Sequence, residues 1–326
     1  MENFELVKIR EQLIERRARL TNAISRINDS CNLVSLLQKV DSALERMDTG
    51  VYGLCEVCHG HIEVDRLRAD PLITLCLSDL NEAQKKILEQ DINLASKIQM
   101  GLLPKNNISE FGNEISYHYQ PAGPVSGDYC DIMVDDQNEN ILFVVGDISG
   151  KGIAASMLMT HVHALVHSLI GLNLPVNAMM ERINRLFCES SLYSHFITMI
   201  LGKISEDGKV EIANAGHCFP VVIKKNNLIN IDSTGMPMGV FQSEEYLKSD
   251  FYLENGETIL IYTDGLSEAN LGEIEYGVER INNIASKNYN IPPQYLINSF
   301  LEDVYGFANK SNLRDDLSIM AIHRKG

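Results

Sequence analysis

Apolar residues at helical spacing dominate the first part of the chain. Leucines recur every seven residues from Leu6 to Leu20, and a second apolar stripe follows over 33–47. A polar break at residues 28–30 separates the two stripes. This pattern predicts one helix over 1–29 and another over 33–47. We expect an antiparallel hairpin in which the two helices bury their stripes against each other, with pairing between two molecules as the alternative.

A third helical pattern covers 79–103 and ends at Pro104, which cannot continue a helix. One seven-residue apolar series starts at Leu80 and a second starts at Leu88. Two stripes on one helix indicate neighbours on two sides, such as a dimer seam and a domain contact. A buried connector helix is the alternative interpretation.

From residue 114 onward the pattern changes to mixed strands and helices. The predicted strands are 115–120, 129–134, 140–146, 196–204, 209–214, 219–224, 228–232, 257–263 and 316–323. The predicted helices are 153–171, 175–190, 276–288 and 292–307. Most strands follow one another through short turns, which indicates antiparallel meanders and not alternating βαβ units. A sheet sandwich flanked by helices, of the α+β class, satisfies this order.

The composition is that of a globular protein with an acidic surface. Of the 326 residues, 45% are hydrophobic and 22% are charged, and the length suits two or three domains. The net charge of -16 repels phosphate backbones, so we expect no bulk binding of nucleic acid. The same charge suits a protein that gathers carboxylates around cations.

Segments that mark export or membrane insertion are not expected. Apolar runs such as 141–145 are far shorter than the ~20 residues needed to span a bilayer. The N-terminus lacks a basic region followed by an apolar stretch. Seven cysteines in a long chain do not form the pattern of a disulfide framework. We therefore expect a cytoplasmic protein with no membrane partner.

Acidic residues lie at the ends of four predicted strands. The motifs share an Asp beside a Gly or beside a second Asp, and they are Gly127-Asp128, Gly146-Asp147, Asp264-Gly265 and Asp315-Asp316. A single Asp-Gly is usually a turn, because glycine lets the backbone bend sharply. Four carboxylates that converge at one end of a sandwich would repel one another, and divalent cations bound through oxygen would resolve that conflict. The spacing of these residues alone is consistent both with ordinary turns and with a metal site.

These four motifs, with two others, resemble the metal-dependent PPM protein phosphatases, and most of all their bacterial RsbU/SpoIIE branch. The matching segments are 126–131, 145–155, 214–217, 235–239, 262–265 and 314–318. The segment 95–104 resembles the helix that precedes the catalytic domain in that branch. The resemblance covers about 94–324 and implies an αββα sandwich.

Carried over by position, the resemblance implies a centre of two Mn²⁺ or Mg²⁺ ions. Asp147 would bridge both ions, with the carbonyl of Ile148 on one of them. Asp128 would bind the ion on one side, and Asp264 and Asp315 would bind the other ion. A mixed shell of carboxylates and water is typical of such hard cations.

The implied reaction is in-line attack on phosphorus by a hydroxide that the two metals generate, with no covalent enzyme intermediate. Asp131 and Asp316 are further candidates, as outer or alternate ligands. Ser149 stands where the eukaryotic relatives in this resemblance carry a His. The proton donor therefore stays open among Lys151, His217 and a water on the metal.

Three histidines, His161, His163 and His167, fall on the predicted helix 153–171. His163 and His167 are four residues apart, so a metal pair is geometrically possible. No carboxylate or cysteine accompanies them locally, and we do not expect a metal there.

Cysteines follow the second predicted helix. Cys55 and Cys58, with Cys76 further on, have three of the four positions of a structural zinc site. The fourth position, three residues after Cys76, holds Asp79, a poorer partner in a sulfur-rich shell. Zinc on these four residues, with a nearby histidine as a substitute ligand, is one reading. A metal-free finger held by apolar contacts and a redox-sensing thiol cluster are the others.

The sequence around these cysteines resembles the DksA/TraR zinc-finger family over about 33–80. The segments that carry the resemblance are 43–47, 50–55 and 66–71. Members of that family act on RNA polymerase through a coiled-coil hairpin and a finger, and the predicted hairpin is compatible with that shape. The hairpin break carries Asp29 where the family usually offers paired acidic residues.

The sequence thus predicts three parts. They are a helical hairpin with a finger over 1–80, a linker helix over 81–104 and a phosphatase domain over 105–326. We expect a serine/threonine protein phosphatase that depends on Mn²⁺ or Mg²⁺. The resemblance implies that its substrate is a phosphorylated STAS-type anti-sigma-factor antagonist in a partner-switching pathway.

Regulation is expected through the N-terminal module, as a sensor or as a docking site for an activator protein. The linker helix is expected to form a homodimer. The alternative function is a DksA/TraR-like transcription regulator that binds RNA polymerase and keeps the phosphatase domain as a scaffold. Because all four metal-site Asp positions are filled, the enzyme is the preferred reading.

Overall fold

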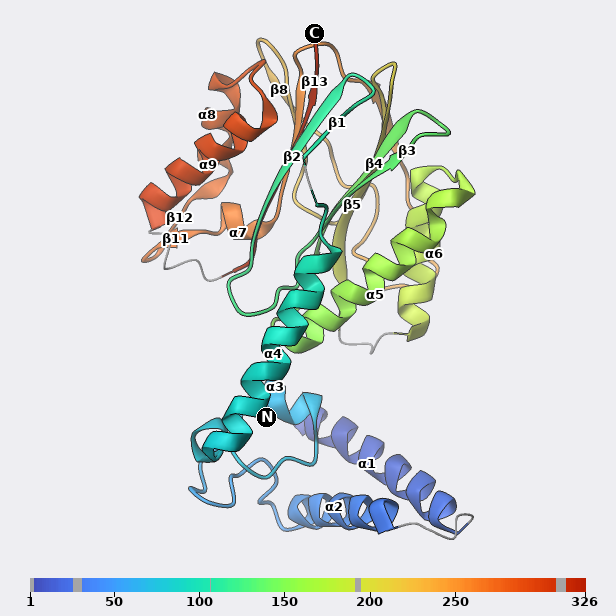
Figure 1. Cartoon of the computed structure of the whole chain (residues 1–326), viewed down its shortest axis with the longest axis vertical. Helices are drawn as coiled ribbons and strands as arrows, with labels where there is room; N and C mark the ends of the chain where they lie inside the picture. Colours follow the sequence, from blue (N-terminus) through green and yellow to red (C-terminus); the bar gives the residue numbers. More distant parts are fainter. Residues whose placement is uncertain (1–2, 26–30, 106, 191–194, 309–314) are drawn as a thin grey trace. The chain divides into compact units, whose positions relative to one another are not determined.

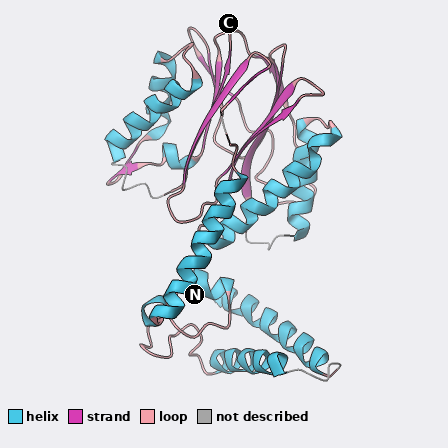
Figure 2. Ribbon diagram, viewed as in Figure 1, coloured by secondary structure: helices cyan, strands magenta, loops and turns pink. Residues whose placement is uncertain are grey.

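The chain divides into two compact units, Met1–Asp91 and Ile92–Gly326, each with its own core. The structure is a computed structural model and describes residues 3–25, 31–105, 107–190, 195–308 and 315–326. The first unit is helical and the second is mixed α and β (Figure 1, Figure 2). One helix, α4 (Glu82–Leu102), continues across the boundary between them.

The first unit opens with a pair of helices. These are α1 (Asn3–Ile24) and α2 (Cys31–Asp48). Their shared core consists of Ile9, Leu13, Leu20, Val40, Ala43 and Leu44. Arg10 pairs with Asp48 and Arg17 pairs with Asp41, both at 2.7 Å, so the two helices run antiparallel. The predicted hairpin is confirmed, and its break at 28–30 lies outside the described residues.

The finger region follows α2 and has a small core of its own. It contains α3 (Val64–Ala69) and the 3-10 turn η1 (Leu77–Asp79). Cys55, Ile62, Leu67 and Cys76 form its interior. The turn after Cys55 is tight, because the Cys55 amide donates to Gly60 and the His59 amide donates back to Cys55. The hydrophobic pattern of the sequence did not predict α3, which is only six residues long.

The second unit contains two antiparallel sheets that face each other. The six-stranded sheet has the order β1 (Ile108–Glu110), β2 (Asn113–Gln120), β13 (Leu317–Arg324), β10 (Thr258–Tyr262), β7 (Val221–Ile223), β8 (Leu228–Asn230). The five-stranded sheet has the order β3 (Tyr129–Asp135), β4 (Asn140–Ile148), β5 (Ile197–Ser205), β6 (Lys209–Ala215), β9 (Ser249–Tyr252). A small hairpin joins β11 (Asn270–Leu271) to β12 (Ile274–Glu275). The predicted antiparallel pairing is confirmed, and β3–β4, β5–β6 and β7–β8 are the predicted consecutive pairs, whereas β13 and β10 pair with strands distant in the sequence.

Helices cover the outer faces of both sheets. They are α5 (Ile153–Leu169), η2 (Ile170–Leu172), α6 (Val176–Ser190), α7 (Asp264–Ser267), α8 (Gly277–Lys287) and α9 (Pro293–Ala308). Figure 1 shows α5 and α6 over the five-stranded sheet and α8 and α9 over the six-stranded sheet. The result is the αββα sandwich that the sequence predicts.

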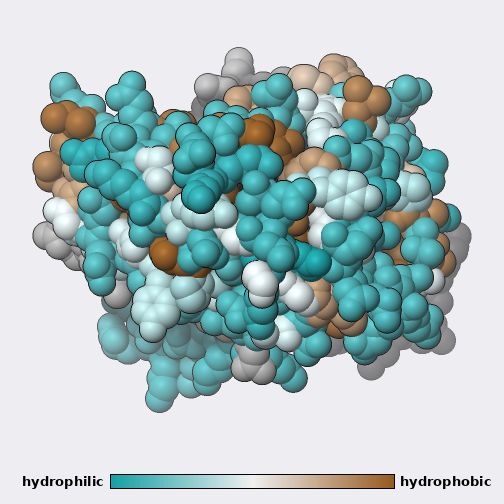
Figure 3. Space-filling model, turned by 90° about the horizontal axis from the view of Figure 1, so that it is seen from above, coloured by the Kyte–Doolittle hydropathy of each residue, from teal (hydrophilic) through white to brown (hydrophobic). Residues whose placement is uncertain are grey.

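Three apolar cores hold these layers together. Alternate residues of the strands point to opposite faces, so each sheet contributes to two cores. Phe143, Ile200 and Ile261 lie between the sheets, while Val144 and Leu201 lie under α5 and α6. A third core lies under α8 and α9. Seen from above, the exposed surface is largely hydrophilic with small apolar patches, in keeping with the acidic composition (Figure 3).

Among the described residues, the helical segment Ile153–Leu172 is long and apolar enough to cross a membrane, by length and composition alone. Within the second unit its residues Ala155, Met159, Val162 and Val166 are buried in the core beneath α5. Packing against the sheet accounts for the apolar residues on this face of the helix.

Candidate metal centre

Asp128 and Asp147 are brought together by the five-stranded sheet. Asp128 immediately precedes β3, and Asp147 is the penultimate residue of β4. Tyr129 pairs with Gly146 in the antiparallel register of these two strands. The two carboxylates therefore lie at the same edge of the sheet, at the end of the sandwich opposite the C-terminus (Figure 1).

The six-stranded sheet supplies the other aspartates. Asp264 begins α7 directly after β10, and Asp315 and Asp316 directly precede β13. Because Tyr262 pairs with Ile319 across these two strands, both acidic segments lie at the same end of the sheet. All the acidic strand ends singled out in the sequence thus meet at one end of the sandwich. Arg314, the first residue of the last motif, lies outside the described residues.

Asp128 joins the two sheets through its carboxylate. Its Oδ2 accepts hydrogen bonds from Thr263 Oγ1 at 2.9 Å and from Ser318 Oγ at 2.6 Å. Thr263 follows β10 and Ser318 belongs to β13, so one oxygen on the first sheet ties both strands of the second. A carboxylate that accepts two hydroxyl groups is fixed in orientation, with its second oxygen left for other partners.

Asp316 fixes the loop that carries Asp128. Its Oδ1 accepts from the Ala122 amide at 2.7 Å, and its Oδ2 accepts from the Gly127 amide at 2.9 Å. Both carboxylate oxygens therefore accept hydrogen bonds from backbone amides, which favours a role for Asp316 in positioning this loop over direct binding of a metal ion.

Two glycines allow the motifs to touch. A Cβ on Gly127 would lie 3.0 Å from the Ile148 carbonyl oxygen and 3.6 Å from Asp147 Oδ1. A Cβ on Gly265 would lie 1.9 Å from the Asp316 carbonyl oxygen. Glycine is required at position 265 because a Cβ would overlap the Asp316 backbone, and at position 127 a Cβ would be tightly crowded against Ile148.

The gathered carboxylates raise one another's pKa. Burial and the neighbouring Asp147 and Asp316 raise the pKa of Asp128 well above its usual range. Burial and the charges of Asp264 and Asp315 raise the pKa of Asp147 to about 7. The pKa of Asp264 is also raised, by burial and by Asp315. These mutual pKa shifts show that the five strand-end aspartates, at positions 128, 147, 264, 315 and 316, interact electrostatically with one another.

The residues present fit hard divalent cations. The donors are carboxylate oxygens with the Ile148 carbonyl beside them, and oxygen donors are those that Mg²⁺ and Mn²⁺ prefer. Lys151 Nζ contacts Asp315 Oδ2 at 2.8 Å and supplies a single positive charge at the edge of the group. One partly exposed ammonium does not offset several buried carboxylates, whereas divalent ions would.

His217 lies in the turn after β6 and is held there by its backbone and its Nδ1. Its amide donates to Asn214 Oδ1 at 2.7 Å, and its Nδ1 lies 2.8 Å from Thr198 Oγ1. Burial lowers the pKa of His217 to about 4. The imidazole is therefore neutral near pH 7, which disfavours it as the proton donor relative to Lys151 or a water.

Asp131 lies apart from the strand-end carboxylates. Its Oδ2 accepts from the Tyr129 hydroxyl at 2.9 Å and its Oδ1 accepts from the Ile132 amide at 2.8 Å. The remaining partners of this carboxylate are two histidines of α5. The alternate-ligand role considered for Asp131 is thus not favoured by its position on the strand.

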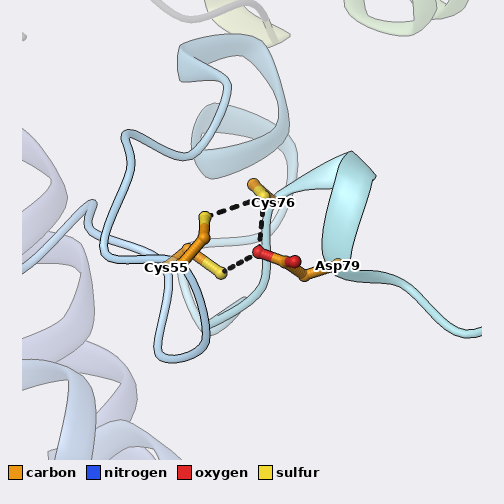
Figure 4. Close-up of side chains that lie close together, drawn as sticks. Cys55, Cys76 and Asp79 are labelled. Atoms are coloured by element: carbon orange, nitrogen blue, oxygen red, sulfur yellow. Dashed lines mark hydrogen bonds between the residues drawn. The ribbon is translucent and has the colours of Figure 1, made fainter.

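A second group of metal-ligating residues lies in the finger. The ligand atoms of Cys55, Cys58, Cys76 and Asp79 are all within 4.8 Å of one another, and we call them the cysteine cluster. Asp79 Oδ2 accepts from the thiols of Cys55 and Cys76, each at 3.1 Å, and Figure 4 shows these side chains pointing toward one another. Hydrogen bonds from the thiols lower the pKa of Asp79. An anionic carboxylate among three sulfurs fits a zinc ion, with Asp79 as the fourth ligand.

The fold is that of the PP2C-like phosphatases. The SiaA-PP2C domain of Pseudomonas aeruginosa superposes with a TM-score of 0.66 at 17% identity, over 75% of this chain and 99% of that one. The RsbU and RsbW domains of a Mycobacterium tuberculosis protein give a TM-score of 0.56 at 23% identity, over 67% of this chain and 61% of that one. RsbX, solved in complex with magnesium, gives 0.51 at 16% identity, over 67% of this chain and 98% of that one.

The family model described as Stage II sporulation protein E (SpoIIE) matches residues 137–325, more than half of the chain, and the chain belongs to this family. Phosphoserine phosphatase RsbU of Bacillus subtilis is 28% identical over 184 residues, which are 56% of this chain and 54% of that protein. Phosphoserine phosphatase RsbP of the same organism is 27% identical over 189 residues, 55% of this chain and 46% of that protein. The chain spans about half the length of these curated relatives.

The cysteine cluster is expected to bind one zinc ion through thiolates. Cobalt substituted for zinc in the full-length protein should give a thiolate-to-cobalt charge-transfer band in the near ultraviolet. Cys76→Ser should lose that band, because the variant removes one of three sulfur ligands from a site of four. Cys188→Ser, which changes a cysteine outside the cluster, should keep it. A wild-type protein without the band would exclude zinc and favour the metal-free or redox readings.

Proposed function

We propose that this protein is a Mn²⁺- or Mg²⁺-dependent phosphatase that hydrolyses phosphoserine or phosphothreonine in a protein. The observation that carries this proposal is the meeting of Asp128, Asp147, Asp264 and Asp315 at one end of the sandwich in a chain of the SpoIIE family. Two relatives named phosphoserine phosphatases and a similar fold solved with magnesium support it.

Asp147 is the central residue of the proposed centre. Its charge is coupled to Asp128 in its own sheet and to Asp264 and Asp315 in the other, as expected of the ligand shared by two ions. The Ile148 carbonyl is the neighbouring donor. Ions held by these residues would lower the pKa of a bound water and neutralise the phosphoryl oxygens.

Lys151 is the residue proposed to contact the substrate phosphate. The hydrogen bond to Asp315 raises the pKa of the Lys151 ammonium, so this side chain is cationic at neutral pH. It follows Gly150 and precedes Gly152, both at positive φ, in the loop that leads from β4 into α5. An ammonium there can bind a phosphate oxygen or deliver a proton to the leaving alkoxide.

Substitution of the central aspartates should abolish hydrolysis. With Mn²⁺ and p-nitrophenyl phosphate, Asp147→Asn and Asp264→Asn should each lower kcat/KM by about two orders of magnitude or more. The physical reason is that metal stabilisation of the transition state is worth several kcal/mol. Asp136→Asn, an exposed carboxylate in the turn between β3 and β4, is the matched control and should hydrolyse at the wild-type rate.

Equal rates in the wild type and both variants would remove the phosphatase proposal. That outcome would favour the alternative, a transcription regulator that acts on RNA polymerase through the finger. The cysteine cluster and the helical hairpin are the observations that keep this alternative in view.

We propose a phosphorylated STAS-type anti-sigma-factor antagonist as the substrate, in a partner-switching pathway. The support is that the relatives include RsbU and RsbP, and that a similar structure contains RsbU and RsbW domains together. Phosphoproteomes should be compared between cells with the wild-type protein and cells with Asp147→Asn. A serine or threonine phosphosite on a small STAS protein should accumulate in the variant. Accumulation confined to proteins of other classes would contradict this substrate.

Regulation is proposed to pass from the N-terminal module, 1–80, through the linker helix, 81–104, to the phosphatase domain, 105–326. The contact that supports this route is made by Gln99, a buried residue near the end of α4. Gln99 Nε2 donates to the Ser126 carbonyl at 2.7 Å, and the Ser126 amide donates back to Gln99 Oε1 at 3.0 Å. Ser126 Oγ in turn accepts from the Asp128 amide at 3.0 Å. Movement of α4 would therefore act on the backbone of a proposed metal ligand.

The linker helix is proposed to form the seam of a homodimer. Ile87, Leu94 and Ile98 are each more than half exposed, and they are spaced by seven and four residues along α4. Such a stripe is unfavourable in water and typical of a helix that pairs with another.

Sedimentation velocity of the full-length protein should give the mass of a dimer. Leu94→Glu should shift the protein to a monomer at the same concentration, because the variant places a charge in the apolar seam. Asn93→Glu adds the same charge at an exposed polar position of α4 that is neither three, four nor seven residues from Ile87, Leu94 or Ile98, so this variant should remain dimeric. Only monomer in the wild type at high concentration would contradict the seam.

A further inference from the structure

The carboxylate of Asp131 faces α5 and not the space between the sheets. Its neighbours on β3 alternate, so that Tyr129 and Met133 lie in the core under α5 while Cys130 and Ile132 lie between the sheets. Asp131 shares the face of Tyr129, and its side chain is 5% exposed. A carboxylate buried to this degree requires partners of opposite charge or hydrogen-bond donors.

Two histidines of α5 face this carboxylate. His167 Nε2 lies 2.7 Å from Asp131 Oδ2, and His163 Nε2 lies 3.8 Å from the same oxygen. The two imidazole rings are stacked, with centroids 4.1 Å apart and planes inclined by 25°. The ligand atoms of Asp131, His163 and His167 all lie within 4.8 Å of one another, and we call these three residues the imidazole cluster.

The surroundings of the cluster orient its members. Tyr129 donates its hydroxyl to the Asp131 oxygen that faces the histidines, and the Ile132 amide donates to the other oxygen. The backbone of Leu102 lies beside His163, and the edge of the Tyr129 ring packs against the His163 imidazole. In metal sites the neighbours of the ligands usually orient them in a similar way, and here hydrogen bonds from Tyr129 and Ile132 fix the carboxylate of Asp131.

An ion pair between His167 and Asp131 accounts for one histidine and leaves His163, 3.8 Å from the same oxygen, without a role in the pair. Burial and the neighbouring His167 lower the pKa of His163, which favours its neutral form. Two stacked rings cannot both be cationic without repulsion, and a single Asp131 oxygen is already shared with Tyr129. A cation between the three ligand atoms would satisfy both imidazoles in their neutral form together with the carboxylate.

We propose that Asp131, His163 and His167 bind a transition-metal ion of the Zn²⁺ class, at a site separate from the strand-end carboxylates. Two imidazoles and one carboxylate are a donor set that Zn²⁺ accepts in a tetrahedral shell, with water as the fourth ligand. The strand-end carboxylates offer oxygen alone and suit harder ions. The two sites therefore select different metals by the chemistry of their donors.

The position of the site gives the metal a structural consequence. It would hold β3 to α5, and through His163 it would also fix the end of α4 at Leu102. Gln99, which bonds with Ser126, lies three residues earlier on the same helix. An ion in the imidazole cluster would therefore stiffen the end of α4 beside the loop that carries Asp128.

Zinc titration of the full-length protein tests the proposal. In excess Mg²⁺, which occupies oxygen sites, competition with a chromophoric chelator should give two tight Zn²⁺ equivalents, one in the cysteine cluster and one in the imidazole cluster. His167→Ala and His163→Gln should each lose one equivalent, with affinity lowered by about tenfold or more. Cobalt at this site should add visible ligand-field bands without a thiolate charge-transfer band, which distinguishes it from the finger.

His161→Ala is the matched control. His161 lies on the same helix, but its ring nitrogen contacts Ser190 and it is outside the cluster, so the variant should keep both equivalents. His167 has a side chain that is 41% exposed, so its replacement should leave the fold intact, which circular dichroism verifies. Identical zinc titrations and cobalt spectra for wild type, His167→Ala and His163→Gln would overturn the proposal and leave an ordinary hydrogen-bonded group.

Discussion

The constraint on which the rest of the second unit depends is electrostatic. Closing two antiparallel sheets at one end forces Asp128, Asp147, Asp264 and Asp315 into one partly buried group. Their mutual repulsion opposes folding unless cations or protons compensate it. The hydrogen bonds from Thr263 and Ser318 to Asp128 hold the sheets together against that repulsion. A stable scaffold thus keeps a site whose own charges are unfavourable without metal.

Much of this architecture could be predicted from local pattern. Residues 141–145 of β4 are a continuous apolar run that is buried on both faces, and Gly146-Asp147 follows this run near the end of the strand. The sequence alone therefore predicted both the strand and the candidate site residue at its end. The strands β1 and β9 were missed because they have three and four residues and are largely exposed at sheet edges. Their pairing is decided by neighbouring strands and not by their own periodicity.

Contacts between distant segments account for what the sequence left open. The sequence showed that His163 and His167 of α5 are four residues apart. Their carboxylate partner is Asp131, 32 positions before His163, and it reaches them because its side of β3 faces α5. In the finger, spacing suggested Asp79 as the fourth position, and the turn η1 places its carboxylate against the sulfurs. Local spacing predicts ligands on one element well and ligands from two elements poorly.

Three groups of ligating side chains with different donors occur in the described part of this chain. Sulfur dominates in the finger, imidazole beside β3 and carboxylate at the strand ends. Because selectivity follows donor chemistry and geometry, the three groups need not compete for one ion. Gln99 is hydrogen bonded to the loop of Asp128, and the backbone of Leu102 on the same helix lies beside His163. The end of α4 is thus the element through which the state of one proposed metal site would reach the other, because it contacts residues of both.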